Sequence, residues 1–170
     1  MFFGLNLEKL ILCEPYVHFR KEKDAMENKL NVVKEKSAGI VLFRNISNKN
    51  EFLLLNYPQG HWDLIKGKVE QNETPHETAI RETKEETGIS NIEFVDGFEE
   101  SVEYDFRFKN EVIHKKVIFF LAKTAEEKIS LSHEHNDYLW LGYNDALKKI
   151  TFRNAKNVLS KANELLLSTC

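Results

Sequence analysis

Residues 75–87 carry their own start and stop signals for a helix. Thr74 is a favoured N-cap residue, Pro75 would occupy the first helical position, and Glu77 follows Thr74 at the spacing of a capping box. Gly88 stands where a left-handed glycine ends many helices. The sequence therefore predicts a helix over 75–87 with a loop on each side.

Two adjacent faces of this predicted helix differ in chemistry. One face can pack on a sheet, and its residues are Ala79, Ile80, Thr83 and Thr87. The adjacent face carries Glu82, Glu85 and Glu86. Carboxylates this close repel one another and cost helix stability unless a cation lies among them. Their oxygens favour hard divalent cations such as Mg²⁺ or Mn²⁺, which also bind phosphate oxygens.

Arg81 can tie the helix to the loop before it. It can pair with Glu77 or Glu85 along the helix, and with Glu73 across the loop. Taken alone, however, the three glutamates equally fit the solvated acidic face that most Glu-rich helices carry.

The full spacing favours the metal-binding interpretation, because it matches the Nudix box, G-x5-E-x7-R-E-U-x-E-E-x-G-U, where U is aliphatic. The matching residues are Gly67, Glu73, Arg81, Glu82, Glu85, Glu86, Gly88 and Ile89. The chain thus resembles the Nudix hydrolase superfamily. Thr83 is the one departure; its methyl group can pack on the core while its hydroxyl bonds back along the helix.

The resemblance extends from about Ala38 to Leu166 and points to one subfamily, the asymmetric diadenosine tetraphosphate hydrolases. The strings that carry it, besides the box, are Glu51-Phe52-Leu53-Leu54-Leu55, His61-Trp62, Lys66-Gly67-Lys68-Val69-Glu70 and Leu131-Ser132-His133-Glu134-His135. It implies an α/β/α sandwich around a mixed sheet, and hydrolysis of diadenosine tetraphosphate to ATP and AMP. The implied cofactor is Mg²⁺, with Mn²⁺ as an alternative.

The resemblance also implies roles for individual residues. Glu82, Glu85 and Glu86 would bind the metal together with the backbone carbonyl of Lys66, and Glu134 would be a further ligand or the general base. Glu82 is an equal candidate for the base. The implied catalytic residues are Arg81, Glu82, Glu86 and Glu134.

The same resemblance implies substrate contacts. His61, Lys66 and Lys115 would contact phosphates, and Tyr104 and Phe152 would sandwich an adenine base. Each has a structural alternative: Lys115 is simply solvated, His61 caps a loop, or Phe152 belongs to the core of the last helix.

Two departures from the family pattern affect the loop around Gly67. Leu64-Ile65 precede Lys66 where Pro is frequent, and Gln71-Asn72 replace a frequent Pro-Gly turn. Both changes predict a less rigid loop, which bears on substrate choice more than on metal binding.

The rest of the chain predicts a single α/β (α+β) domain over 36–170, after a charged extension over 1–35. A hairpin is expected from Ala38–Phe43 and Glu51–Leu55. Further extended segments are expected at 94–102, 104–108, 112–122 and 138–141, and an amphipathic helix from Thr151 onward.

Composition narrows the class of protein. Among 170 residues, 42% are hydrophobic and 30% charged, with a net charge of −3, so neither wholesale disorder nor a basic nucleic-acid coat fits. The two cysteines are far apart, and no apolar run approaches a membrane span. We expect a cytoplasmic monomer whose partner is a small nucleotide.

Rival functions share the same motif. Within enzymes, the substrate could be an RNA 5′ end, a nucleotide sugar or an inositol pyrophosphate. From another class, a Nudix module could sense nucleotide without turnover, although a binder has no need of three clustered carboxylates. A third reading gives residues 1–35 a docking role.

Overall fold

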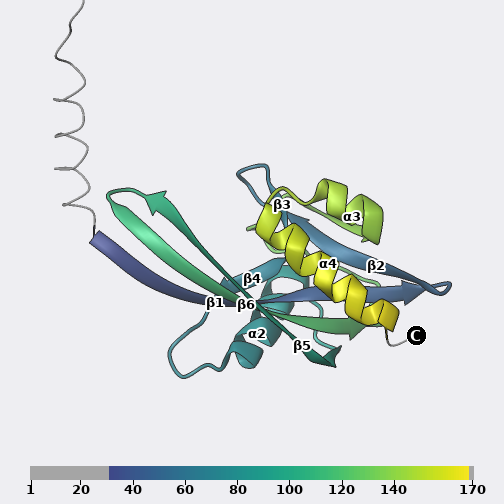
Figure 1. Ribbon diagram of the computed structural model, residues 1–170. Coiled ribbons are helices and arrows are strands. Elements are labelled where there is room, and N and C mark those ends of the chain that lie inside the picture. The colour runs from purple at the N-terminus through teal and green to yellow at the C-terminus, as the bar shows by residue number, and fades with distance from the viewer. Residues whose placement is uncertain (1–30, 169–170) are drawn as a thin grey trace, which may run out of the picture.

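A mixed seven-stranded sheet organises residues 31–168, the part of the chain that the computed structural model describes (Figure 1). The strands follow the order β3-β2-β1-β6-β5, with β4 on β1 and β7 on β2, and β1 and β6 are parallel. The bounds are β1 Asn31–Ile46, β2 Lys49–Asn56, β3 Trp62–Asp63, β4 Ile65–Lys68, β5 Ile92–Phe108, β6 Glu111–Thr124, β7 Asp137–Gly142, α2 Pro75–Thr87, α3 Tyr143–Lys149 and α4 Arg153–Ser168.

Helices cover both faces of this sheet, because its central strands are buried on both sides. In β2, Phe52 and Leu54 face the core under α3 and α4, whereas Leu53 and Leu55 face the core that includes Ala79 of α2. This alternation with a period of two is what strand geometry requires. The expected α/β/α arrangement is confirmed, and no helix among the described residues is long and apolar enough to cross a membrane.

Helix α2 has the predicted limits. Thr74 Oγ1 accepts from the Glu77 amide at 3.2 Å and Glu77 Oε2 accepts from the Thr74 amide at 2.7 Å, while Gly88 adopts a φ of 76°. Thr83 Oγ1 donates to the Ala79 carbonyl, as expected for that departure from the box. Ile80 was assigned to the packing face, which is wrong: it is 41% exposed, because the buried face runs through Ala79, Thr83 and Thr87 instead.

Three strands leave the body together as a projecting arm, made of the outer parts of β1, β5 and β6 (Figure 1). Val33 pairs with Ile113 of β6, and Ile113 pairs with Phe106 of β5. The expected boundary at residue 36 falls inside β1, which begins at Asn31. Residues 1–30 of the expected extension lie outside the described residues.

The remaining elements follow the sequence expectations with local differences. The hairpin forms with Phe43 opposite Phe52, and its turn holds Ser47 and Asn48 at positive φ. The two segments at 94–102 and 104–108 form one strand, β5, with a register shift between Phe94 and Glu99. Helix α3 and the short strands β3 and β4 had no sequence signal of their own.

Candidate active site

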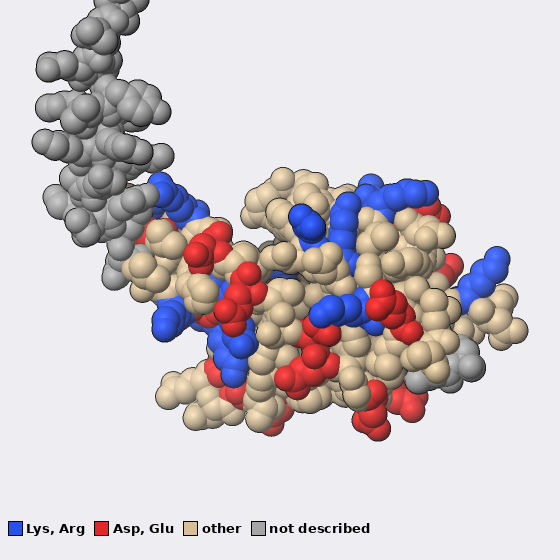
Figure 2. Space-filling model, viewed as in Figure 1, with Lys and Arg blue, Asp and Glu red and all other residues tan. Residues whose placement is uncertain are grey.

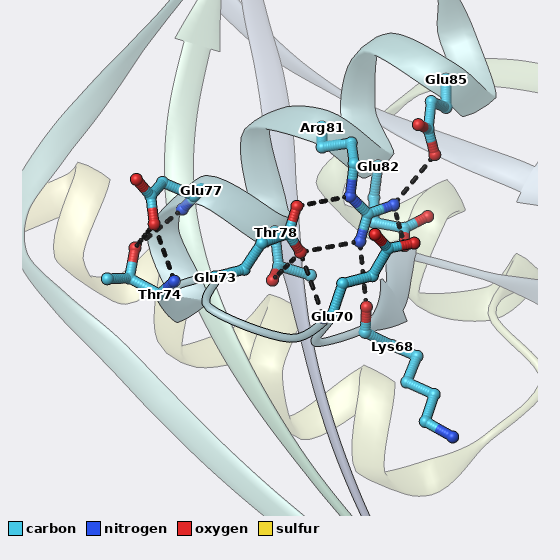
Figure 3. Close-up of polar contacts among 9 residues, drawn as sticks. All are labelled: Lys68, Glu70, Glu73, Thr74, Glu77, Thr78, Arg81, Glu82 and Glu85. Atoms are coloured by element: carbon cyan, nitrogen blue, oxygen red, sulfur yellow. Dashed lines mark hydrogen bonds and ion pairs between the residues drawn. The ribbon is translucent and has the colours of Figure 1, made fainter.

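Arg81 is the centre of a polar network that links the loop before α2 to the acidic residues of α2 (Figure 3). Its Nε and Nη2 donate to the two carboxylate oxygens of Glu73 at 2.7 and 3.0 Å. Its Nη1 donates to Glu82 at 2.7 Å and Glu85 at 2.9 Å, and Nη2 also reaches the Lys68 carbonyl. Of the expected pairs, those with Glu73 and Glu85 form. The guanidinium thus fixes the loop and two of the three clustered carboxylates.

Hydrogen bonding explains the electrostatics of Glu73. The bonds from Arg81 lower the pKa of Glu73 to about 2, with Thr78 and the Glu70 amide contributing. Glu77 does not join Arg81; it closes the capping box instead. Glu73 is therefore a charged anchor for the loop that precedes α2.

The Glu82 carboxyl group lies directly over Gly67. A Cβ atom at position 67 would overlap that carboxyl group, which explains why glycine is needed at the end of β4. Burial raises the pKa of Glu82, and the negative charges of Glu85 and Glu134 raise it further. The hydrogen bond and positive charge of Arg81 oppose this shift. The close approach couples β4 to the acidic face of α2.

Replacing Gly67 with alanine should displace Glu82 without unfolding the protein. The three atoms nearest to the added methyl group all belong to the end of the flexible Glu82 side chain, so we expect kcat to fall roughly tenfold or more, with little change in thermal stability. Gly142→Ala is the matched control, because a Cβ there has nothing within 4 Å. Steady-state kinetics on the two variants would contradict the assignment if Gly67→Ala kept full activity.

Glu86 is a buried carboxyl group with one unpartnered oxygen, although the Lys66 backbone contributes a hydrogen bond to it. It is 5% exposed, and its Oε2 has no hydrogen-bond partner among the described residues. His135 Nε2, also without a hydrogen-bond partner, lies 3.7 Å from Glu86 Oε1. Burial raises the pKa of Glu86 to about 8, and the charges of Glu82 and Glu134 contribute, whereas Lys66 opposes them. A buried carboxyl group with an unpartnered oxygen, close to the charges of two other carboxylates, fits a site built for a cation.

The raised pKa of Glu86 predicts how the metal-free protein responds to pH. The folded form binds this proton more tightly than the unfolded chain, so Glu86 lowers stability progressively as pH rises from about 4.5 to about 8. In thermal unfolding with a chelator present, the melting temperature of Glu86→Gln should rise relative to that of the wild type as pH increases over that range. Parallel melting curves for the two proteins would contradict the burial of a titrating carboxyl group.

The loop that carries Glu134 is docked onto the end of α2. Ser130 and Ser132 donate their amides to the carbonyls of Thr87 and Glu86 at 2.8 and 3.0 Å. Glu134 itself is exposed, yet its charge acts on both Glu82 and Glu86. The structure thereby brings the predicted catalytic carboxylates into one electrostatic cluster. Across residues 31–168, no three His, Cys, Asp or Glu side chains are grouped as a metal would require. In this arrangement Arg81 donates to both Glu82 and Glu85.

A cavity of about 560 Å³ lies on the face of the sheet that α4 covers, between the arm and the body. Figure 2 shows the surface hollowed where the arm leaves the body, with charges of both signs interspersed around it. All five residues predicted to contact substrate line this cavity: His61, Lys66, Tyr104, Lys115 and Phe152. Sequence reasoning missed Asp63 and Phe106, which line it as well.

Burial and contacts bear on the structural alternatives for these residues. Phe152 is 48% exposed and precedes α4, with its ring 5.1 Å from that of His61, so it is not a core residue. The Lys115 side chain is only 17% exposed and its Nζ lies 2.6 Å from Glu35 Oε1, so it is not a solvated lysine. His61 stacks on Tyr57 with centroids 4.7 Å apart, and burial lowers its pKa.

These features define a class of protein. The NUDIX domain family model matches residues 33–161, and the chain belongs to this family as a Nudix pyrophosphohydrolase. It is 37% identical over 146 residues to mouse bis(5'-nucleosyl)-tetraphosphatase [asymmetrical], covering 79% of this chain and 97% of that protein. A crystal structure of a C. elegans Ap4A hydrolase binary complex is similar with a TM-score of 0.71 and 34% identity, covering 79% of this chain and 98% of the other.

Another relative carries a different name. The chain is 36% identical over 130 residues to an RNA pyrophosphohydrolase from Nitratiruptor sp., covering 68% of this chain and 81% of that protein. Relatives of both names therefore match this chain at similar identity.

Proposed function

We propose that this Nudix hydrolase cleaves diadenosine tetraphosphate asymmetrically into ATP and AMP, with Mg²⁺ as its cofactor and Mn²⁺ as a substitute. The observation that carries the proposal is the cavity, in which Tyr104 and Phe152 stand beside Lys66 and Lys115. Base stacking is favourable on such aromatic faces, and the lysines supply donors for phosphates. The names of the tetraphosphatase relatives support the same substrate.

The carboxylates of α2 are suited to hold the metal. Glu82, Glu85, Glu86 and the Lys66 carbonyl would be its ligands, and Glu86 supplies a buried oxygen, Oε2, that has no hydrogen-bond partner among the described residues. When bound, a divalent cation neutralises phosphate oxygens and lowers the pKa of an attacking water. The acidic cluster fits a cation on these chemical grounds.

Glu134 is our choice for the general base in this proposal. The Glu82 carboxyl group accepts a hydrogen bond from Arg81, whereas the Glu134 carboxylate has no hydrogen bond from any described residue. Glu134 lies on the docked loop opposite α2, where it can take a proton from a water held beside Glu82 and Glu86. We take the enzyme to act as a monomer in the cytoplasm.

The test is turnover of diadenosine tetraphosphate with Mg²⁺ in ¹⁸O-labelled water, with separation of the products. ATP plus AMP, with the label in one of them, is the expected result, and two ADP would contradict the asymmetric cleavage. A 5′-triphosphorylated RNA oligonucleotide is assayed alongside. Faster release of pyrophosphate from that RNA would move the assignment to RNA ends, and tight nucleotide binding without turnover would indicate a sensing module.

Phe152→Ala should raise the KM for diadenosine tetraphosphate by about tenfold or more, because one stacking face is worth on the order of 1–3 kcal/mol per base. Stability should change little, since the ring is half exposed. Phe108→Ala is the matched control: it removes a ring of similar exposure, 56%, on the arm outside the cavity. Equal KM values for the two variants would contradict the stacking role.

A further inference from the structure

Asp63 is a buried carboxylate that the function described so far does not use. It lies in β3 beside the cavity and is 5% exposed. Its Oδ1 accepts a hydrogen bond from the Leu64 amide at 2.8 Å, and its Oδ2 pairs with Lys66 Nζ at 2.8 Å. The two side chains are 6% and 13% exposed, so this ion pair is largely withdrawn from water. Both oxygens of Asp63 are therefore engaged with the segment that leads to Gly67.

Tyr57 holds the same lysine from a second direction. Its hydroxyl donates to the Leu64 carbonyl at 3.2 Å and lies 3.3 Å from Lys66 Nζ, from which it accepts. The Lys66 ammonium also lies 4.5 Å from the centroid of the Tyr57 ring. An ammonium group has three N–H donors, and two of them point to Asp63 and Tyr57. One donor is left, on a side chain that lines the cavity.

The main chain around Lys66 has independent support. Leu64 and Ile65 are both fully buried and belong to the two opposite cores, and Lys66 pairs with Gly39 of β1. Burial of Leu64 and Ile65 thus anchors the main chain on both faces of the sheet, immediately before Lys66. Asp63 and Tyr57 are then needed chiefly for the Lys66 side chain, because a long, flexible side chain has many rotamers unless partners restrict it.

We propose that Asp63, together with Tyr57, is a positioning residue that aims the third N–H of Lys66 at a phosphate of the bound nucleotide. The inference rests on the proposed function only in taking a nucleotide phosphate as the ligand of this cavity. Asp63 itself touches no substrate. Because its Oδ1 is held by the Leu64 amide, the carboxylate stays in place while Lys66 contacts a ligand.

The experiment is a comparison of Asp63→Asn with the wild type. Asparagine keeps an acceptor for the Leu64 amide and removes the charge opposite Lys66. We expect the KM for diadenosine tetraphosphate and the Kd for ATP to rise about tenfold, as for loss of a charge-assisted hydrogen bond, with kcat within about twofold. Tyr57→Phe keeps the ring and should give a smaller change in the same direction. Asp145→Asn breaks an exposed Asp–Lys pair of the same spacing, with Lys148, and should change neither constant.

A double-mutant cycle with Lys66→Met separates positioning from a structural role. If Asp63 acts through Lys66, Asp63→Asn should have no further effect on ATP binding in the Lys66→Met background. Independent effects that add would overturn the proposal, and so would tighter ATP binding by Asp63→Asn, which would mean that Asp63 competes with phosphate. The two proposals can fail separately. If the wild type does not cleave diadenosine tetraphosphate but Asp63→Asn still weakens ATP binding, the positioning role is supported and the proposed substrate is refuted.

Discussion

Glu86→Gln is expected to lower kcat about a thousandfold while leaving the protein folded, because a metal ligand contributes several kcal/mol to the transition state and each 1.36 kcal/mol is a factor of ten. Glutamine has the shape of the protonated carboxyl group that the raised pKa of Glu86 favours in the metal-free protein. The fold should therefore accept it without a cavity. Added Mg²⁺ should raise the melting temperature of the wild type and have little effect on the variant.

Glu77→Gln is the control for this prediction. Glu77 belongs to the same helix but is exposed and closes the capping box, a position that glutamine also fills. Steady-state kinetics and thermal unfolding on both variants decide the outcome. If Glu86→Gln kept the wild-type kcat, the assignment of Glu86 as a metal ligand would be contradicted.

Arg81→Lys should lower kcat about a hundredfold and reduce the melting temperature, although the positive charge is kept. Outer partners that orient metal ligands typically contribute 10- to 100-fold, and Arg81 orients both Glu82 and Glu85. Lysine is a single point of charge and cannot make the forked contact with Glu73 while also reaching the other two carboxylates.

Arg44→Lys is the matched control for Arg81→Lys. Arg44 donates from Nε and Nη2 to Glu51 within the β1–β2 hairpin, so its replacement removes a comparable forked contact from that hairpin. A metal titration of activity should show that only Arg81→Lys requires more Mg²⁺. Full activity of Arg81→Lys at ordinary Mg²⁺ would show that charge alone is sufficient at position 81.

The sequence predicted elements whose signals lie within a few residues of one another. The limits of α2 follow from Thr74, Glu77 and Gly88, which interact with the backbone of the same helix, and they were predicted without error. The β1–β2 hairpin was likewise marked by two apolar runs around a polar turn. Ile80 was wrongly predicted to lie on the buried face, because helical periodicity predicts the direction of that face but not its width.

The role of residues near 35 could not be predicted, because it depends on a partner distant in the sequence. Lys34, Glu35 and Lys36 look like part of a solvated extension, yet β1 includes them and pairs with β6 through backbone hydrogen bonds. Such pairing depends little on side-chain polarity, so composition carries no signal for it. As a result, Glu35 meets Lys115 beside the cavity.

The sequence by itself determined the chemistry of this protein: an acidic helix with fixed ends, the spacing of its glutamates and the arginine among them. These features depend on contacts from one residue to its neighbours three or four positions away, which the local chain dictates. Only the tertiary structure decided the state of each group. Burial leaves Glu86 Oε2 without a hydrogen-bond partner among the described residues. Long-range packing sets Asp63 and Tyr57 around Lys66 and opens the cavity between the arm and the body. Burial and pairing between distant segments depend on the whole fold, and so no local pattern records them.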